Sequence, residues 1–424
     1  MAASVLYLDT ARLGQTSPSA LQAQIDFSRL TAEQPSSLYT DRFLQSGIKD
    51  APSCWQERFP GLSNWHGVTE LLQAIKAVAG APDDHEVAVA SRSTALMRSA
   101  VYSMYRLCRN VLTTDFAWPA YRAELCDAAR RSNNRITYVE CREDAFAENI
   151  SLVGLADRIA SAYDRNKCDG LFLPLIDNLG FKLPIGEIIT RISSIRKPRF
   201  ILIDGAQTLG HVPSVDCHDL CDVFLAGSHK WIRAGIPLGI ATFGQPRSRD
   251  VLRAVFKSDD PLSCFVSSLS TGQLQRYSET VNVVPLLACR AASADIPVDV
   301  RVRQQRWTVQ LHNRDKVATL AELAGWQPLL NEPEAQTGIL VLRPSESVAK
   351  CTNGECLRAT LADCGVAAST YSDASIRLSM PQVPLDSAEM NQIGVALTSA
   401  QKVSSMSTSI IRGYANLGIF ASNS

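Results

Sequence analysis

The chain has 424 residues, of which 46% are hydrophobic and 20% are charged, and this length and composition allow two or three structural units around sizeable cores. Its 42 basic residues balance 42 acidic ones, so no charge excess favours a nucleic acid or an anionic membrane as a partner. The first twelve residues lack a basic region followed by a long apolar run, which predicts neither a signal peptide nor a membrane-spanning helix.

Short apolar runs alternate with helical patterns over the first two thirds of the chain. Five runs predict buried strands, at residues 86–90, 171–176, 200–203, 223–226 and 240–243. Between the first two, residues 94–111 carry apolar side chains at helical spacing, and Pro174 indicates an edge strand or the end of a strand. Strands that alternate with helices predict right-handed crossovers and a mostly parallel sheet, and therefore an α/β fold.

The pattern changes after about residue 285. A long basic helix is predicted at 301–326, and its arginines are typical of a solvated face. A strand, a helix and a second strand are then predicted at residues 338–342, 355–364 and 374–379. These elements indicate a second, smaller domain of the α+β class.

The predicted domain boundaries follow from this change of pattern. We place a large domain at residues 15–285 and the small domain at residues 286–403, together with residues 1–14. Residues 404–424 are rich in serine and asparagine, which predicts a loosely held tail.

Twelve cysteines are scattered along the chain without a Cys-x-x-Cys pair. In a chain of this length the pattern is typical of reduced thiols and favours a cytoplasmic protein. Cys217, His218 and Cys221 suggest a zinc site, but no second cluster completes the four ligands that such a site needs. Because the two cysteines are four residues apart, we interpret them as buried thiols and expect no metal.

Two predicted strand ends carry the most informative side chains. Asp204 opens the segment Asp204–Gln207 (DGAQ) directly after one apolar run, and Lys230 lies in Ala226–Trp231 (AGSHKW) after the next. Ligands of mostly parallel sheets bind beyond the carboxyl ends of the strands, so the two side chains are expected to lie together. A lysine that forms a Schiff base and an acid that pairs with a pyridinium nitrogen are what a pyridoxal 5′-phosphate (PLP) enzyme needs.

The chain resembles the class V aminotransferase family of PLP enzymes. The resemblance is strongest at Asp204–Gln207 with Gly210–His211 and at Ser228–Trp231 (SHKW), and it extends from about residue 7 to about residue 397. This family has the large fold of the aspartate aminotransferase type and includes cysteine desulfurases, C–S lyases and isopenicillin N epimerase-like enzymes. The resemblance implies a large PLP-binding domain with a mostly parallel sheet of the seven-stranded type, and a smaller α+β C-terminal domain.

The resemblance also implies roles around the pyridine ring. Lys230 would form the Schiff base and Asp204 would bond the ring nitrogen, so these two are the predicted catalytic residues. Gln207 matches a position that bonds the ring's 3′-oxygen. Trp118 matches a ring-stacking position, although a plain core tryptophan is a serious alternative.

The predicted phosphate site lies where a strand meets a helix. Ser93 and Thr94 open the helical pattern, and backbone N–H groups and hydroxyls at a helix N-terminus bind anions. The family usually has glycine where Arg92 stands, which implies either a rearranged loop or an added charge from Arg92 toward the phosphate or the substrate. Ser228 and His229 flank the lysine and would contact the phosphate, although Ser228 is displaced by one residue from the family pattern.

A second candidate contact to the ring or the substrate lies before Gly180. The family often places an asparagine near such a glycine. The spacing to Gly180 favours Asp177, whereas the residue type favours Asn178, and the choice between them stays open. A plain turn is the structural alternative for both residues.

Two further residues complete the predicted site. Arg377 matches the arginine that grips the α-carboxylate of the substrate, which suits a planar guanidinium. Thr280 resembles the position that reaches the phosphate of the neighbouring subunit, although the glycine that the family has before it is absent. If Thr280 acts in this way, the protein is a homodimer with a shared active site.

The predicted function is that of a PLP-dependent enzyme acting on an α-amino acid or amino-acid-like metabolite, through an external aldimine and a quinonoid carbanion. Cysteine desulfurases carry a nucleophilic cysteine shortly before the arginine that corresponds to Arg377, and no cysteine lies between Gly365 and Arg377. We therefore favour elimination or replacement at the side chain, of the C–S lyase kind. An aminotransferase or epimerase of the same family is the alternative, and a catalytically inactive binding partner is the alternative from another class.

Overall fold

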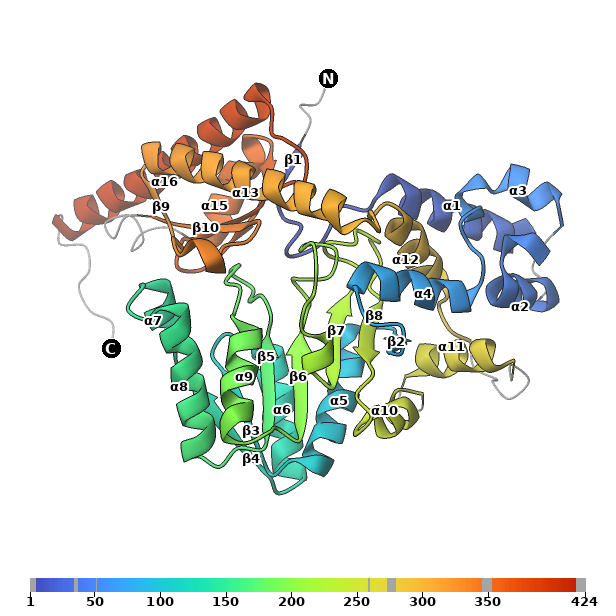
Figure 1. Ribbon diagram of the computed structural model, residues 1–424. Helices are drawn as coiled ribbons and strands as arrows, with labels where there is room; N and C mark the ends of the chain where they lie inside the picture. The colour runs from blue at the N-terminus through green and yellow to red at the C-terminus, as the bar shows by residue number, and fades with distance from the viewer. Residues whose placement is uncertain are drawn as a thin grey trace, which may run out of the picture. The chain divides into compact units, whose positions relative to one another are not determined.

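The structure is a computed structural model that describes residues 5–33, 37–50, 52–257, 260–272, 280–344 and 353–416. It divides the chain into two compact units (Figure 1). Unit 1 comprises Met1–Arg12, Leu179–Phe181 and Gln305–Ser424, and unit 2 comprises Leu13–Asn178 and Lys182–Gln304. Within the described ranges, every helix is too short or too polar to cross a lipid bilayer.

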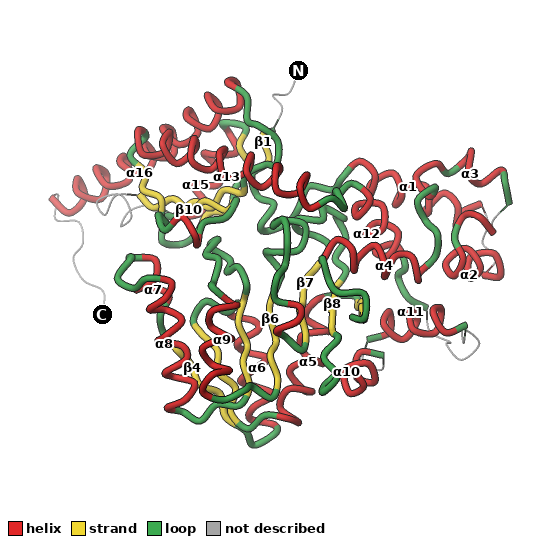
Figure 2. The backbone as a smooth tube through the Cα atoms, in the orientation of Figure 1, coloured by secondary structure: helices red, strands yellow, loops and turns green. Residues whose placement is uncertain are grey.

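Unit 2 is built on a seven-stranded sheet in the order β2-β8-β7-β6-β5-β3-β4. Figure 2 draws the strands in yellow and the helices around them in red. The strands are β2 (Glu86–Ala90), β3 (Asn110–Thr114), β4 (Arg135–Val139), β5 (Gly170–Pro174), β6 (Phe200–Asp204), β7 (Val223–Gly227) and β8 (Gly239–Phe243). Only β8 is antiparallel to its neighbours, β2 and β7. The predicted α/β class with a mostly parallel sheet is therefore confirmed.

Helices cover both faces of this sheet, with α8 and α9 on one face and α5 and α6 on the other (Figure 1). The α-helices of unit 2 are α1 (Pro18–Glu33), α2 (Ser37–Ser46), α3 (Cys54–Arg58), α4 (Val68–Ala79), α5 (Ser93–Leu107), α6 (Pro119–Arg131), α7 (Arg142–Phe146), α8 (Leu152–Arg165), α9 (Ile185–Ile195), α10 (Arg249–Phe256), α11 (Pro261–Thr271) and α12 (Val284–Ala294). Because both faces are covered, the central strands β3, β5, β6, β7 and β8 are buried along their whole length.

Local sequence signals set several helix starts. Proline occupies the first helical position of α6 and of α11, where its missing N–H costs nothing. The Asp260 carboxylate caps α11 by accepting hydrogen bonds from the next two free N–H groups. On α5, the apolar residues Met97, Val101 and Met104 face the core cluster that lies against the sheet.

Two predicted elements differ from the structure. The predicted helix 94–111 ends at Leu107, and residues 110–114 form the interior strand β3. Cys108 and Val111 continue the helical spacing of apolar residues although they belong to the next turn and strand, which explains the overextension. Pro174 does end its strand, but β5 lies inside the sheet between β3 and β6, so the edge interpretation was wrong.

Unit 1 contains a four-stranded antiparallel sheet in the order β12-β13-β10-β9 and a two-stranded parallel sheet of β1 and β11. The strands are β1 (Leu6–Tyr7), β9 (Trp326–Pro328), β10 (Ile339–Pro344), β11 (Val366–Ala367), β12 (Ser369–Thr370) and β13 (Ile376–Ser379), and the α-helices are α15 (Gly354–Asp363), α16 (Ser387–Asn416) and the part of α13 (Val300–Leu323) from Gln305 onward. Its core includes Leu8, Trp326 and Leu357.

The predicted basic helix differs from these elements, and part of the predicted tail is helical. The helix expected at 301–326 ends at Leu323, and Trp326 instead opens β9. α16 continues through residues 404–416, and residues 417–424 lie outside the described part of the chain, so a loosely held tail at 404–424 stays a prediction.

Candidate active site

Polar side chains follow three strands of unit 2 at one edge of the large sheet. Asp204 is the last residue of β6, and Lys230 follows the adjacent strand β7. β2 runs parallel to β7, since each is antiparallel to β8, so Ser91 lies beyond the same edge. The carboxyl ends of parallel strands are where ligands of such sheets bind.

Asp204 is a buried carboxyl that interacts with Lys230. Its Oδ1 atom accepts a hydrogen bond of 2.9 Å from the N–H of Ala206. Burial raises the pKa of Asp204 to about 6, and the Ala206 hydrogen bond and the positive charge of Lys230 oppose this rise. The structure thus brings the predicted acid and the predicted lysine into one electrostatic site.

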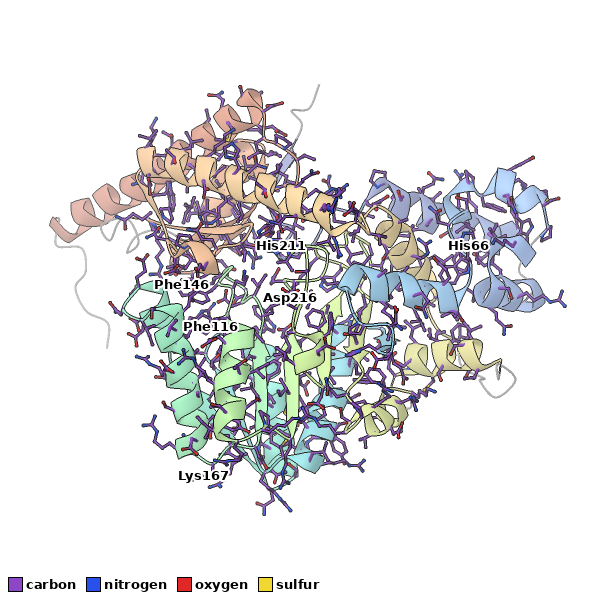
Figure 3. The ribbon with its side chains drawn as sticks, in the orientation of Figure 1. His66, Phe116, Phe146, Lys167, His211 and Asp216 are labelled. Carbon is purple, nitrogen blue, oxygen red and sulfur yellow. The ribbon has the colours of Figure 1, made fainter. Side chains whose placement is uncertain are left out.

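Gln207, His211 and Trp231 form a packed cluster next to this pair. The indole Nε1–H of Trp231 donates to Gln207 Oε1 at 2.9 Å, and the His211 and Trp231 rings stack with centroids 3.7 Å apart. His211 Nδ1 lies 2.7 Å from the backbone oxygen of Gln207. Burial lowers the pKa of His211 to about 3, so this ring is neutral at physiological pH. Figure 3 shows His211 among the loops beyond the strand ends.

The segment that carries Lys230 is held by backbone contacts. The N–H of Gly14 donates to the His229 carbonyl at 2.7 Å, and a Cβ at Gly14 would lie 1.9 Å from the Lys230 carbonyl oxygen. The Ser228 hydroxyl donates to the Ile236 carbonyl and accepts from the Leu238 N–H, at 3.2 and 3.1 Å. Ser228 therefore closes the loop between β7 and β8.

His229 differs from Ser228 because its ring has an unsatisfied atom. Its buried Nδ1 atom has no hydrogen-bond partner among the described residues. Burial, followed by the charge of Lys230, lowers the pKa of His229 to about 4. A neutral, half-buried imidazole with an open nitrogen beside the lysine is suited to bonding a ligand oxygen.

The segment between β2 and α5 presents a helix N-terminus at the same edge. Arg92 is exposed and extended, and Ser93 and Thr94 begin the 15-residue helix α5. The Ser93 hydroxyl accepts a hydrogen bond of 3.1 Å from Tyr121. Ser91 instead turns toward α11, since its hydroxyl donates to Asp260 Oδ2 at 2.6 Å. The first N–H groups of α5 point to an anion site at this position.

Arg142, which the sequence analysis did not single out, joins the two candidates after β5. Its Nη2 atom donates to Asp177 Oδ2 at 2.6 Å and to Asn178 Oδ1 at 2.9 Å. Asp177 is buried and the Arg142 side chain is 26% exposed. Because both side-chain oxygens bond the same guanidinium, the structure gives Asp177 and Asn178 a shared partner.

Trp118 precedes α6 and is 47% exposed, unlike a core tryptophan.

Aromatic side chains lie near this guanidinium. The Arg142 guanidinium carbon is 5.8 Å from the centroid of the Phe146 ring, and the Phe146 and Phe116 rings are 6.2 Å apart. Figure 3 labels both phenylalanines, which come from α7 and from the loop after β3.

Arg377 lies on β13 in unit 1, where it is buried beside a carboxylate. Its Nη2 atom donates to Ser369 Oγ at 3.1 Å and lies 3.5 Å from Asp9 Oδ1. The Ser369 hydroxyl donates to the same Asp9 oxygen at 2.6 Å, and the guanidinium also lies over the Tyr371 ring. Arg377 is thus held by β12, β13 and the N-terminal segment.

Two other predictions concern different parts of the chain. Thr280 is exposed, and the preceding residues 273–279 lie outside the described part. Within the described ranges, no three His, Cys, Asp or Glu side chains form a metal-binding group. The ring nitrogens of His218 lie at hydrogen-bond distance from the Ala79 carbonyl and the Thr242 hydroxyl.

Comparisons with known proteins define the fold. No protein-family model and no curated protein sequence matches the chain. Among solved structures, a C-DES variant with glycine covalently linked to its PLP cofactor is 15% identical, with a TM-score of 0.67 over 93% of this chain and 97% of that one. The fold is that of PLP-dependent enzymes of the aspartate aminotransferase type.

Other proteins with this PLP-enzyme fold catalyse different reactions. Ureidoglycine-glyoxylate aminotransferase from Bacillus subtilis is 13% identical, with a TM-score of 0.66 over 97% of this chain and 99% of that one. The cysteine desulfurase CsdA from Escherichia coli is 15% identical, with a TM-score of 0.63 over 94% and 95%. One fold hosts both reactions, so the reaction of this chain has to be argued from its own residues.

Proposed function

We propose that the chain binds PLP through Lys230 and acts on an α-amino acid or an amino-acid-like metabolite. The observation that carries this proposal is the electrostatic interaction between the buried Asp204 carboxyl and Lys230. The two residues lie at the carboxyl ends of the adjacent strands β6 and β7. Bound PLP would supply an electron-accepting ring that stabilises negative charge on the substrate Cα.

The residues at the strand ends fit this cofactor. A buried carboxyl with a raised pKa favours a cationic partner, which suits a hydrogen bond from a protonated ring nitrogen to Asp204. The N–H groups at the start of α5, with Ser93 and Thr94, would hold the phosphate. His229, whose buried Nδ1 has no described partner, would add a contact to it, and Ser228 would hold the loop closed around it.

The remaining ring contacts follow from side-chain chemistry. Gln207 would bond a ring oxygen, and the exposed Trp118 would offer a flat face to the ring. Because indole does not exchange protons at neutral pH, the proton of the substrate Cα would move to and from Lys230 Nζ. Lys230 would therefore act both as the covalent anchor and as the general acid and base.

Arg377 would bind the α-carboxylate of the substrate. A guanidinium offers several N–H donors in one plane, and here one of its nitrogens already lies near Asp9 and Ser369. A planar guanidinium suits a carboxylate, which can accept two parallel hydrogen bonds from it. Arg92, and Asp177 or Asn178 positioned by Arg142, would contact the rest of the substrate.

We favour elimination or replacement at the side chain, of the C–S lyase kind, over transamination or epimerisation. The support is the absence of a cysteine between Gly365 and Arg377, which disfavours persulfide chemistry from a loop cysteine. We also propose a cytoplasmic homodimer in which Thr280 reaches the partner's phosphate. Sedimentation equilibrium would test the dimer, and a monomer would exclude that role of Thr280.

The test of cofactor binding is an absorption spectrum of the purified protein with PLP, before and after borohydride, with Lys230→Ala as the control. We expect a visible band that borohydride removes and a covalent label at Lys230. A protein that gains no band with PLP would refute the proposal and favour a catalytically inactive binding partner.

A panel of amino acids then tests the reaction type. Elimination releases a keto acid, ammonia and the leaving group while the cofactor remains an aldehyde, whereas transamination releases a keto acid and leaves the amino group on the cofactor as its amine form. Stoichiometric amine formation would exclude the elimination proposal and favour the aminotransferase alternative.

A further inference from the structure

A cavity of about 260 Å³ lies along the free edge of β2 in unit 2. Among the described strands, β2 is an edge strand that pairs with β8 alone. Residues of α4, α10 and α11 line the cavity together with β2 itself. The volume is slightly below the roughly 300 Å³ at which ordinary small-molecule pockets begin, so the cavity suits a small ligand.

The backbone of β2 points hydrogen-bonding groups into this space. The Ser263 hydroxyl donates to the Val89 carbonyl at 2.5 Å, and the Ser91 N–H donates to the Asp260 carboxylate at 3.1 Å. These two bonds show that residues 89 and 91 direct their backbone groups away from β8. Because this direction alternates along an antiparallel strand, the N–H and C=O of Val87 face the same free edge.

α11 supplies partners to only part of this edge. Asp260 and Ser263 satisfy the groups nearest the end of β2, whereas no backbone or side-chain partner of the Val87 N–H or C=O occurs on this side among the described residues. Val87 lines the cavity, and so does Ser267, one turn beyond Ser263 on α11. A paired N–H donor and C=O acceptor therefore lie at the wall of a space large enough for a ligand.

The side chains around Val87 define the charge and polarity of the cavity. Lys76 and Lys257 line it, and the third cation, Arg253, is already paired with Glu86 through hydrogen bonds of 2.9 and 3.0 Å from its Nε atom. The cavity therefore carries an excess of positive charge. Its apolar wall is formed by Leu72, Phe243, Phe256 and Val266.

We propose that this cavity binds an apolar α-amino acid residue with a free carboxylate, either as a small molecule or as the C-terminal residue of a peptide. In an antiparallel pair, a residue opposite Val87 exchanges two hydrogen bonds with it. The ligand N–H donates to the Val87 carbonyl, and the ligand carboxylate accepts from the Val87 N–H. Lys76 and Lys257 balance the carboxylate, and the apolar wall takes the ligand side chain.

The test uses the full chain and N-acetyl-L-leucine, with binding measured by calorimetry in the presence and absence of PLP. The acylated nitrogen of this probe does not react with aldehydes, so the result is independent of the proposed cofactor. We expect saturable binding. We also expect the affinity to fall at least about tenfold for N-acetyl-L-leucinamide, which lacks the carboxylate, and for N-acetyl-N-methyl-L-leucine, which lacks the N–H.

Variants locate the binding site. Two tryptophan variants fill the cavity from different positions of α11: Val266→Trp, and Ser270→Trp at an exposed position of the lining. Each is expected to abolish binding. Lys76→Gln should weaken binding, while Lys197→Gln, at an exposed site outside the lining, should leave it unchanged. Thermal unfolding identifies the tryptophan variant that keeps its fold.

Acetyl-Gly-Gly-Leu distinguishes the two sources of the ligand. Tighter binding than that of N-acetyl-L-leucine assigns the site to a peptide terminus, and equal or weaker binding assigns it to a small molecule. The proposal is overturned by absent binding at millimolar concentration, by equal affinity for the two modified probes, or by binding that survives in a folded tryptophan variant.

Discussion

Replacing Asp204 by asparagine is expected to stabilise the PLP-free protein at neutral pH. Burial raises the pKa of this carboxyl from 3.8 to about 6, so the ionised form is disfavoured in the folded state. The gap of roughly two pH units corresponds to about 3 kcal/mol at ~1.4 kcal/mol for each unit. Asparagine avoids this penalty, and its side-chain oxygen can still accept the Ala206 N–H.

The sign of the pH dependence follows from proton binding. Between about pH 4 and pH 6 the folded protein keeps the Asp204 proton while the unfolded chain has lost it, so the stability of the wild type falls as the pH rises through this window. The Asp204→Asn variant has no carboxyl at this position and therefore does not lose this stability as the pH rises. The difference in unfolding free energy should therefore be near zero at about pH 4, and should reach about 3 kcal/mol above pH 6.

Urea unfolding followed by tryptophan fluorescence from pH 4 to pH 8 measures this difference. Asp127→Asn on α6, where the side chain is 40% exposed, is the matched control and should change stability by less than about 0.5 kcal/mol. Added PLP should stabilise the wild type more than the Asp204→Asn variant. A variant that is less stable than the wild type at pH 7, or a difference independent of pH, would refute the reasoning.

Three further substitutions test the contacts of unit 2. Asp222→Ala removes a fully buried carboxylate that binds Arg247. The free energy of unfolding, measured in urea, should fall by about 3–5 kcal/mol, and a fall below about 1 kcal/mol would contradict this reasoning. Trp231→Phe removes the donor to Gln207 and should cost about 1–2 kcal/mol in the same assay, whereas an unchanged midpoint would show that the bond contributes nothing. Gly239→Ala places a Cβ 2.4–2.5 Å from the backbone atoms of Arg92 and Ser93, which must shift to make room for it. Because this backbone belongs to the proposed phosphate site, PLP titration should show weaker binding. Unchanged affinity would count against a phosphate site there.

Much of the large sheet could be predicted from the sequence because a strand buried on both faces is a continuous apolar run. Residues 200–203 and 223–226 illustrate this, and both became central strands. β3 and β4 escaped prediction for the opposite reason. Residues 110–114 read NVLTT and residues 135–139 read RITYV. Polar side chains interrupt the apolar run in both strands, although β3 is fully buried.

The candidate site was predictable where a motif directly follows a recognised strand, as at Asp204 and Lys230. Arg142 escaped because it follows the unrecognised strand β4, and no local pattern links it to Asp177, which is 35 residues away in the sequence. The contact of Ser228 with Ile236 and Leu238 also depends on the path of the loop. Such contacts between distant residues are set by tertiary structure and leave no periodic signal.

The pairing of β1 with β11 cannot form until the ribosome has synthesised most of the chain. Leu6 pairs with Val366, and Leu8 is fully buried in the core of unit 1. At ~5–20 residues per second, synthesis of the roughly 360 residues between the two strands takes about 20–70 s. During this interval the strand made first has no partner and its apolar side chains stay uncovered. The N-terminal segment therefore stays available for non-native contacts until β11 has been synthesised.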